Sequence, residues 1–200
     1  MNILIILAHP DKNSFNHAIA EACKKKIREN GHTLIFHDLY SEDFAPILYK
    51  EEIPKNGVYG ELIKRHCNEL TQSDGVIIVH PNWWGQPPAI LKGWVDRVIR
   101  PGIAYEFEEG DKGDGVPNGL LKAETALVFN TSNTYEEREN KLLLDPLETI
   151  WKNCIFDFCG VKKFYRKMFR VIITSSQKQR EEWLDEVKNT INNYFPVQNV

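Results

Sequence analysis

Apolar residues occur along this chain in short runs that alternate with longer amphipathic stretches. Five short runs are typical of buried strands, at residues 3–7, 33–37, 76–79, 125–129 and 167–173. Apolar residues at helical spacing predict helices after the first and third strands and at residues 62–70, 146–158 and 177–195. Strands that alternate with helices build a parallel sheet with right-handed crossovers. We therefore expect an α/β fold with a five-stranded parallel sheet of order 2-1-3-4-5.

The helices after the first and third strands carry clear end signals. Asn13 or Ser14 suits the cap of the first helix, and Gly31 ends it. The Pro87-Pro88 pair suits the start of the second, because the first turn of a helix has no partner for its N–H groups. The buried face of this second helix consists of Ile90, Leu91, Trp94, Val95, Val98 and Ile99.

The other segments carry weaker patterns. Residues 38–60 are polar and punctuated by Pro and Gly, which indicates an ordered excursion with a short helix. Residues 110–119 read as a turn-rich loop. The acidic run of Glu136, Glu137 and Glu139, interrupted by Arg138, is typical of a solvated loop or helix face.

Composition narrows the class of protein. A chain of 200 residues, 42% hydrophobic and 26% charged, fits one domain spanning residues 1–200. A net charge of −3 gives no reason to expect nucleic acid or an anionic membrane as a partner. No apolar stretch is long enough to insert into a membrane, and Met1 leads directly into a strand. The four cysteines show no C-x-x-C spacing. This is typical of reduced thiols in a cytoplasmic protein, most of which serve as packing residues.

The loop after the first strand, HPDKNSFN, is the first candidate for chemistry. It contains neither G-x-G-x-x-G nor a P-loop glycine pattern. It leads instead into a helix N-terminus, which favours a phosphate group, with Ser14, Asn16 and His9 as further donors. The alternative is that Ser14 only caps the helix and His9 only forms part of the turn.

The loop after the third strand holds two adjacent tryptophans, Trp83 and Trp84. Both loops follow strands that flank the switch point of the predicted sheet, so they face one crevice. Both tryptophans could be core anchors, as Trp94 on the buried helix face is expected to be. Side chains at adjacent positions usually diverge, however, so one of the pair is expected at the crevice. A ligand that has both a phosphate and a large flat ring is a flavin nucleotide.

These motifs resemble a known family, the DT-diaphorase-like NAD(P)H:quinone oxidoreductases of flavodoxin-like fold. HPDKNSFN resembles the family's flavin phosphate loop, and DLYSEDFAPI its segment after the second strand. HPNWWGQPPAILKGWVDRVIRPGIAYEF is similar to its flavin-ring and substrate segment, PAILKGW being the most specific part. The likeness is good over about the first 130 residues. It implies a flavodoxin-like three-layer sandwich.

The resemblance also implies roles for individual residues. His9, Phe15 and Asn16 would hold the flavin phosphates. Tyr105 and Phe107 would border the substrate pocket. The residues implied along the flavin ring are Pro81, Asn82, Trp83, Trp84 and Gly85.

One further segment departs from the family. Asn130, Thr131, Ser132 and Asn133 occupy the place of a Thr-Thr-Gly-Gly turn at the flavin, and three of these four residues differ from it. We therefore expect a different backbone path at this turn. No histidine follows His80, so this chain also lacks the Tyr–His pair that the family's eukaryotic members carry beyond the turn.

The resemblance implies a flavin-dependent reductase. NAD(P)H would reduce the flavin, leave, and be replaced by a quinone or similar flat acceptor, in ping-pong order. FAD is the implied cofactor, with FMN as the alternative, and a homodimer with the active site at its interface is the implied assembly. Two rival functions stay open: a flavin-binding regulatory subunit of a potassium-efflux transporter, and a one-electron carrier of the flavodoxin type. No metal site is expected, because His9 and His80 have no carboxylate or thiol at helpful spacing.

Overall fold

The fold is a three-layer sandwich around a parallel sheet. The computed structural model describes residues 1–112 and 114–198, so Gly113 of the predicted loop 110–119 and the last two residues lie outside it. Five strands pair in parallel in the order β2-β1-β3-β6-β7. They are β1 (Asn2–Leu7), β2 (Thr33–Asp38), β3 (Gly75–Pro81), β6 (Thr125–Ser132) and β7 (Lys163–Arg170). The predicted flavodoxin-like order of the five parallel strands is thus confirmed.

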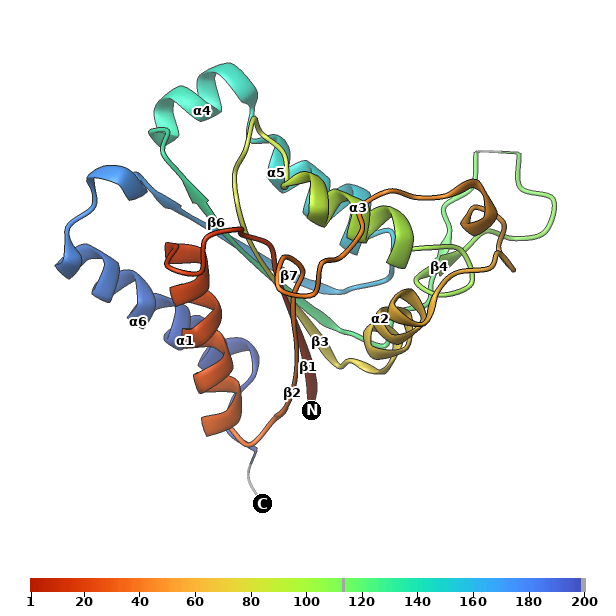
Figure 1. Cartoon of the computed structure of the whole chain (residues 1–200), viewed down its shortest axis with the longest axis horizontal. Helices are drawn as coiled ribbons and strands as arrows, with labels where there is room; N and C mark the ends of the chain where they lie inside the picture. Colours follow the sequence, from red (N-terminus) through yellow and green to blue (C-terminus); the bar gives the residue numbers. More distant parts are fainter. Residues whose placement is uncertain (113, 199–200) are drawn as a thin grey trace.

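Helices cover both faces of the sheet (Figure 1). On one face, α1 (Phe15–Glu29) packs beside α6 (Gln177–Tyr194). On the other face lie α2 (Glu61–Gln72), α3 (Ala89–Val98) and α5 (Pro146–Glu148). No helix in the described part of the chain is long and apolar enough to cross a membrane.

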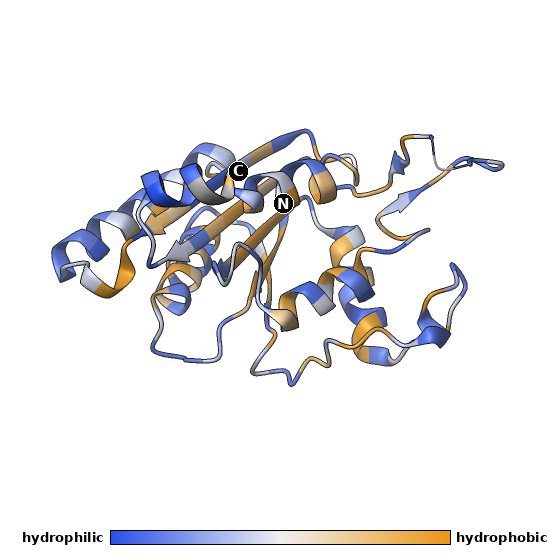
Figure 2. Ribbon diagram, turned by 90° about the horizontal axis from the view of Figure 1, so that it is seen from above, coloured by the Kyte–Doolittle hydropathy of each residue, from blue (hydrophilic) through white to orange (hydrophobic). Residues whose placement is uncertain are grey.

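Two hydrophobic clusters, one on each face, hold the layers together. Along β1, Ile3, Ile5 and Leu7 pack toward α1 and α6, while Leu4 and Ile6 pack toward α2 and α3. Side chains of successive strand residues point to opposite faces, so a strand covered on both faces must be apolar at every position. Figure 2 shows this, with hydrophobic strands at the centre and striped helices outside.

The fifth strand is displaced from its predicted position. β7 begins at Lys163 and ends at Arg170, not at residues 167–173, and Ile172–Thr174 forms a short 3-10 turn, η3. Within the described residues β7 pairs only with β6, so it is an edge strand. Its sequence KFYRKMFR mixes polar and apolar residues, because an edge strand is less completely covered than a central one. The predicted bounds were wrong because the apolar residues at 171–173 belong to η3 and the mixed pattern before them does not mark the start of the strand.

Several shorter elements complete the chain. The helix predicted at residues 146–158 is α5 followed by a π-helical segment, η2 (Thr149–Phe156). The sequence did not predict the two-stranded hairpin of β4 (Tyr105–Glu106) and β5 (Asn118–Gly119). The acidic run opens the helix α4 (Glu136–Leu143), and the excursion at residues 38–60 holds a 3-10 turn, η1 (Lys50–Glu52).

Two arginines of the α3 segment fix the excursion. Arg97 donates two hydrogen bonds to the carboxylate of Glu52, at 2.6 and 2.9 Å, and a third to the carbonyl of Ala45 at 2.6 Å. Arg100 donates to the carbonyl of Pro54 at 3.1 Å. Paired, hydrogen-bonded charges of this kind are tolerated when buried. The long polar segment is therefore ordered without a hydrophobic core of its own.

Candidate active site

A cavity of about 620 Å³ opens at the carboxyl ends of β1, β3 and β6. This is the edge of an open α/β sheet at which ligands bind. The cavity brings together most of the predicted cofactor residues: His9, Ser14, Phe15, Asn16, Pro81, Asn82, Trp83, Trp84, Gly85, Thr131, Ser132 and Asn133. Asn130, Tyr105 and Phe107 do not line it.

The loop between β1 and α1 leaves hydrogen-bond donors free toward the cavity. Nδ1 of His9 lies 3.1 Å from the backbone nitrogen of Asp11 and 3.2 Å from its carbonyl oxygen, and these contacts hold the imidazole within the turn. Burial lowers the pKa of His9, which favours the neutral ring. Ser14 caps α1, its hydroxyl accepting from the N–H of His17 at 3.3 Å, and it also lines the cavity. The first turn of α1 is suited to an anion.

Asn16 links α1 to the end of β6. Its Nδ2 donates to Oγ1 of Thr131 at 2.9 Å, and its side chain is only 2% exposed. Among the described residues its Oδ1 has no hydrogen-bond partner, although a buried polar atom ordinarily has one. A ligand with N–H or O–H groups would satisfy this oxygen.

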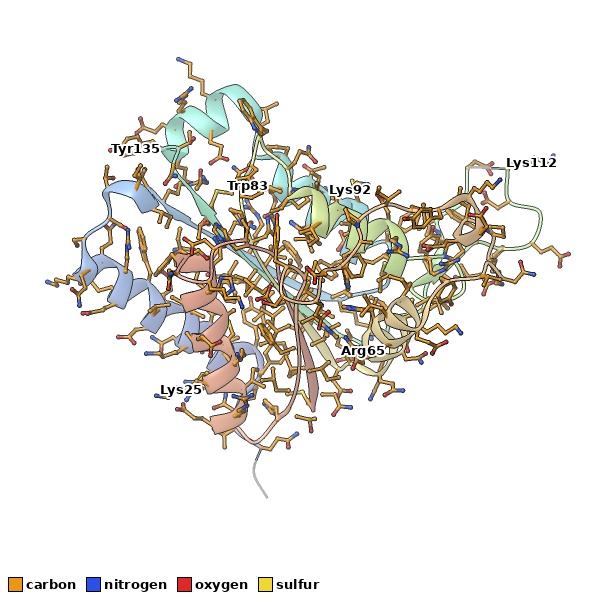
Figure 3. All side chains as sticks on the ribbon, viewed as in Figure 1. Lys25, Arg65, Trp83, Lys92, Lys112 and Tyr135 are labelled. Carbon is orange, nitrogen blue, oxygen red and sulfur yellow. The ribbon has the colours of Figure 1, made fainter. Side chains whose placement is uncertain are left out.

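The aromatic loop, residues 82–86 after β3, is a tight turn with exposed tryptophan rings. Trp83 and Gln86 exchange backbone hydrogen bonds at 3.1 and 3.0 Å, and Trp84 and Gly85 both have positive φ, of 59° and 73°. Trp84 is 99% exposed and Trp83 40% exposed, so neither is a core anchor. The Trp83 ring lies 6.2 Å from the ring of His9. In the view of Figure 3, Trp83 lies between Tyr135 and Lys92 and away from Lys25.

The end of β6 differs from the prediction. The strand was expected to end at Phe129 and to be followed by a turn, but it continues to Ser132. The extension exists because Asn130 and Thr131 pair with both β3 and β7. Thr131 and Ser132 therefore reach the cavity from a strand rather than from a turn.

His80, at the end of β3, is the centre of a buried polar network. Its Nδ1–H donates to the carbonyl of Pro81 at 2.8 Å. Its Nε2 accepts from Nε1 of Trp151 and from Nδ2 of Asn130, each at 2.8 Å. Burial lowers the pKa of His80 to about 3, so the ring is neutral and both nitrogens are in use. This network, rather than the cavity, is where Asn130 acts.

Glu139 was expected on a solvated face, and this was wrong. The side chain is 1% exposed, forms an ion pair with Arg170 and accepts a hydrogen bond from Nδ2 of Asn82. Because an ionised carboxylate only accepts, it fixes the orientation of the Asn82 amide. The Oδ1 of Asn82 is buried and has no hydrogen-bond partner in the part of the chain that the structure describes. It is a second acceptor at the cavity.

Arg180 is a cavity residue that the sequence gave no reason to select. It lies in the first turns of α6, where Nε donates to Oγ of Ser175 at 2.8 Å and an Nη donates to the carbonyl of Ile172 at 2.9 Å. These bonds hold the turn after β7 and bring a positive charge to the cavity wall. The wall also contains Arg138. Both favour an anionic ligand group.

The two predicted substrate residues gather elsewhere. Tyr105, Phe107 and Phe158 form an aromatic cluster, with ring centroids 5.1 to 5.9 Å apart. Within one chain this cluster lies outside the cavity. Of the predicted packing cysteines, Cys154 is exposed on η2, whereas the other three are buried.

One group of side chains in the described residues has the composition of a metal site. Ligand atoms of His37, Glu42 and His66 lie within 4.8 Å of one another. However, Nε1–H of Trp94 donates to Nδ1 of His66 at 3.1 Å, so a neutral His66 carries its hydrogen on Nε2. That Nε2–H faces Glu42 at 3.1 Å. The hydrogen-bond pattern thus accounts for the group, since a metal ligand needs an unprotonated nitrogen.

Comparisons with known proteins agree with this geometry. A family model described as flavodoxin-like fold matches residues 1–195. An NAD(P)H oxidoreductase of Haemophilus influenzae is 35% identical over 92% of this chain and 91% of its own length. The ribosyldihydronicotinamide dehydrogenase [quinone] of Mus musculus is 27% identical over 94% of this chain and 90% of its own.

A solved structure extends the likeness to three dimensions. The NAD(P)H:quinone oxidoreductase of Methanothermobacter marburgensis superposes with a TM-score of 0.84 at 25% identity, over 97% of this chain and 96% of that one. The sequence motifs, the strand order and the position of the cavity agree with this likeness. The chain therefore belongs to the NAD(P)H:quinone oxidoreductase family of flavodoxin-like fold.

Proposed function

We propose that this chain is a flavin-dependent NAD(P)H:quinone oxidoreductase that transfers two electrons in ping-pong order to a quinone or similar flat acceptor. Family membership supports the reaction type. The observation that carries the proposal is the cavity of about 620 Å³ between the N-terminus of α1 and the aromatic loop. It offers an anion site and a flat, partly apolar wall in one space.

The residues present fit a flavin nucleotide. Its phosphate end would meet the first turn of α1, the imidazole of His9 and Arg180. Its ring would lie along the aromatic loop and the end of β6. The buried oxygens of Asn16 and Asn82, which have no hydrogen-bond partner among the described residues, are suited to the N–H and O–H groups that a flavin carries. When bound, a flavin supplies reversible hydride acceptance, while the protein orients it and excludes water.

The finer assignments rest on the resemblance. We propose FAD as the cofactor, with FMN as the alternative, NAD(P)H as co-substrate, and a single cytoplasmic domain. We also propose a homodimer, in which the cluster of Tyr105, Phe107 and Phe158 borders the cavity of the partner chain. The exposed apolar side chains of Ile53 and Val58 lie on either side of Lys55 in the sequence, which is ion-paired with Glu106 of β4, and they support a covered surface beside this cluster.

The test is the absorbance spectrum of the purified protein, followed by anaerobic titration with NADH or NADPH. We expect bleaching of a bound flavin and its reoxidation by simple benzoquinones or naphthoquinones. Parallel double-reciprocal plots would indicate one binding site that NAD(P)H and the acceptor occupy in turn. Intersecting plots would contradict the ping-pong order, and failure to bind any flavin would contradict the whole proposal.

A pair of variants links the activity to the cavity. Asn16→Ala is expected to weaken flavin binding by about ten- to a hundredfold, because it removes a buried polar group from the wall. Asn193→Ala, at an exposed position on α6, is the matched control and should bind as the wild type does. Equal affinities for the two variants would place the flavin elsewhere.

A further inference from the structure

The hydroxyl of Ser14 faces two ways, into the cavity and back toward His17. Ser14 lines the cavity, whereas His17 lies behind it on α1 and does not. Oγ of Ser14 is 3.0 Å from Nδ1 of His17, and Nε2 of His17 is 3.3 Å from Oδ2 of Asp38. Ser14, His17 and Asp38 thus form a continuous hydrogen-bonded row from the cavity wall to the end of β2.

The direction of each hydrogen bond in this row is set by Asp38, which lies at the end away from the cavity. Oδ1 of Asp38 accepts from the backbone N–H groups of Tyr40 and Ser41, and Oδ2 accepts from the Ser41 hydroxyl at 2.7 Å. Such a carboxylate is an acceptor only, so Nε2 of His17 carries a hydrogen. In a neutral His17 the other nitrogen, Nδ1, is then bare. It must receive the hydroxyl hydrogen of Ser14, which is thereby turned away from the cavity.

Protonation of His17 reverses this arrangement. With hydrogens on both ring nitrogens, Nδ1–H donates to Oγ of Ser14 and Nε2–H still donates to Asp38. The Ser14 hydroxyl hydrogen is then free to donate into the cavity. A positive charge also appears one residue layer behind the proposed phosphate site, where it attracts an anion.

We propose, resting on the function proposed above, that His17 is a positioning residue that couples binding of the flavin phosphate to uptake of one proton. The proton is taken from solvent by Nδ1 of His17, and the Ser14 hydroxyl turns from that nitrogen to a phosphate oxygen. No covalent bond to the flavin is made or broken. Phosphate-bearing flavins therefore bind more tightly as the pH falls through the range in which histidine titrates.

The charged groups around His17 are few among the described residues. Asp38 approaches from β2 at 3.3 Å, and His9 approaches from the loop after β1 with ring centroids 6.3 Å apart. One turn further along α1, Glu21 is paired with Lys24 at 2.5 Å. His9 is thus the one other histidine that touches this row, and the experiment must separate its effect from that of His17.

Three flavins serve as probes of the purified apoprotein: riboflavin, FMN and FAD. Their dissociation constants are measured by fluorescence quenching between pH 6.5 and 8.5. This range lies above the second pKa of a phosphate monoester, near 6, so FMN keeps most of its charge. We expect FMN or FAD to bind about fivefold more tightly at pH 6.5 than at pH 8.5. Riboflavin, which has no phosphate, should bind equally at both.

Calorimetry and variants complete the test. Binding of FMN or FAD in two buffers of different ionisation enthalpy should show net proton uptake at pH 7, up to one proton per flavin. His17→Gln should abolish the pH dependence and the proton uptake while leaving riboflavin affinity unchanged. His9→Gln is the matched variant and should keep both.

The outcomes separate this proposal from the one on which it rests. If no flavin binds, both are wrong. If FMN and FAD bind independently of pH, or if the dependence is lost in His9→Gln and kept in His17→Gln, only the role of His17 is wrong. A riboflavin affinity that varies with pH as FMN affinity does would also overturn it, because no phosphate is then involved. If a variant fails to fold, proton uptake measured on the wild-type chain still tests the proposal, because the absence of uptake would overturn it.

Discussion

The indole N–H of Trp151 donates to Nε2 of His80 at 2.8 Å, and both side chains are fully buried. The bond joins η2 to the end of β3, directly beneath the cavity. Trp151→Phe removes the donor and leaves part of the space empty. We expect it to lower the free energy of unfolding by about 1–3 kcal/mol, measured by urea denaturation.

Trp183→Phe is the control for that measurement. It makes the same chemical change on α6, at a partly buried ring for which the described residues show no indole hydrogen bond. We expect a smaller loss of stability. Equal losses for the two variants would mean that ring packing alone explains the role of Trp151.

The buried His80 predicts acid sensitivity. In the unfolded chain a histidine takes up a proton as the pH falls below about 6.5. In the folded chain burial lowers the pKa of His80 to about 3. Its contribution to stability is therefore complete above pH 6.5 and is lost progressively toward pH 3, by up to about 1.4 kcal/mol per pH unit. Urea denaturation of His80→Gln should show a flatter dependence between pH 7.5 and 5, and an unchanged slope would refute this.

Breaking the buried ion pair of Glu139 and Arg170 is expected to destabilise the folded chain. Glu139→Gln leaves Arg170, whose side chain is 11% exposed, without its anion. We expect a loss of about 3 kcal/mol in the free energy of unfolding, much of it recovered in the double variant with Arg170→Gln. Glu137→Gln, at an exposed position on α4, is the control and should stay within about 0.5 kcal/mol of the wild type. Additive single effects would show that the pair is not coupled.

The cysteines predict a simple labelling pattern. Burial raises the pKa of Cys67 to about 11 and that of Cys159 to about 12, and also raises the pKa of Cys23. Cys154 is exposed. Because the thiolate is the reactive form, an aromatic disulfide reagent at pH 8 should label one thiol rapidly in the native protein and all four in denaturant. Cys154→Ser should remove the rapid phase, and its persistence would mean that a buried thiol is accessible.

We expect that Tyr135 does not take part in a proton relay within its own chain. It lies beyond β6 but is 70% exposed, and no histidine follows His80 in the chain. A positioned acid or base contributes about 10²–10⁴-fold to a rate. Tyr135→Phe should therefore leave the rate of flavin reduction, followed by stopped-flow absorbance, within about threefold of the wild type. A hundredfold loss would give Tyr135 a catalytic role.

The central strands of the fold could be predicted from the sequence because they are buried on both faces. β1 and β3 are covered on both faces, so each is a continuous apolar run with only one plausible assignment. β7 has one free edge and a mixed pattern, and its predicted position was wrong by about four residues at its start. The loops that follow β1 and β3 were placed at the cavity by topology alone, because parallel strands end at a common edge.

The rest of the site could not be predicted, because its contacts are not local. Glu139 meets Arg170 and Asn82, which are 31 and 57 positions away, and nothing in the acidic run separates it from its exposed neighbours. The same holds for Asn130, whose side chain turns from the cavity to His80. Such pairings depend on the orientation of whole elements, which a periodic pattern does not specify.

The complete burial of β3 and β6 has a consequence for the time scale of motion in the molecule. Amides in strands that lack any solvent-facing side exchange with deuterium only through large-scale opening. Thr131 and Ser132, which line the cavity, belong to these strands, and Arg138 and Glu139 bring α4 to the cavity wall. Ligands therefore meet a floor that stays closed to exchange for as long as the protein stays folded. The wall contributed by α4 is tied to β7 by the ion pair of Glu139 with Arg170, so this pair limits how readily the wall can open.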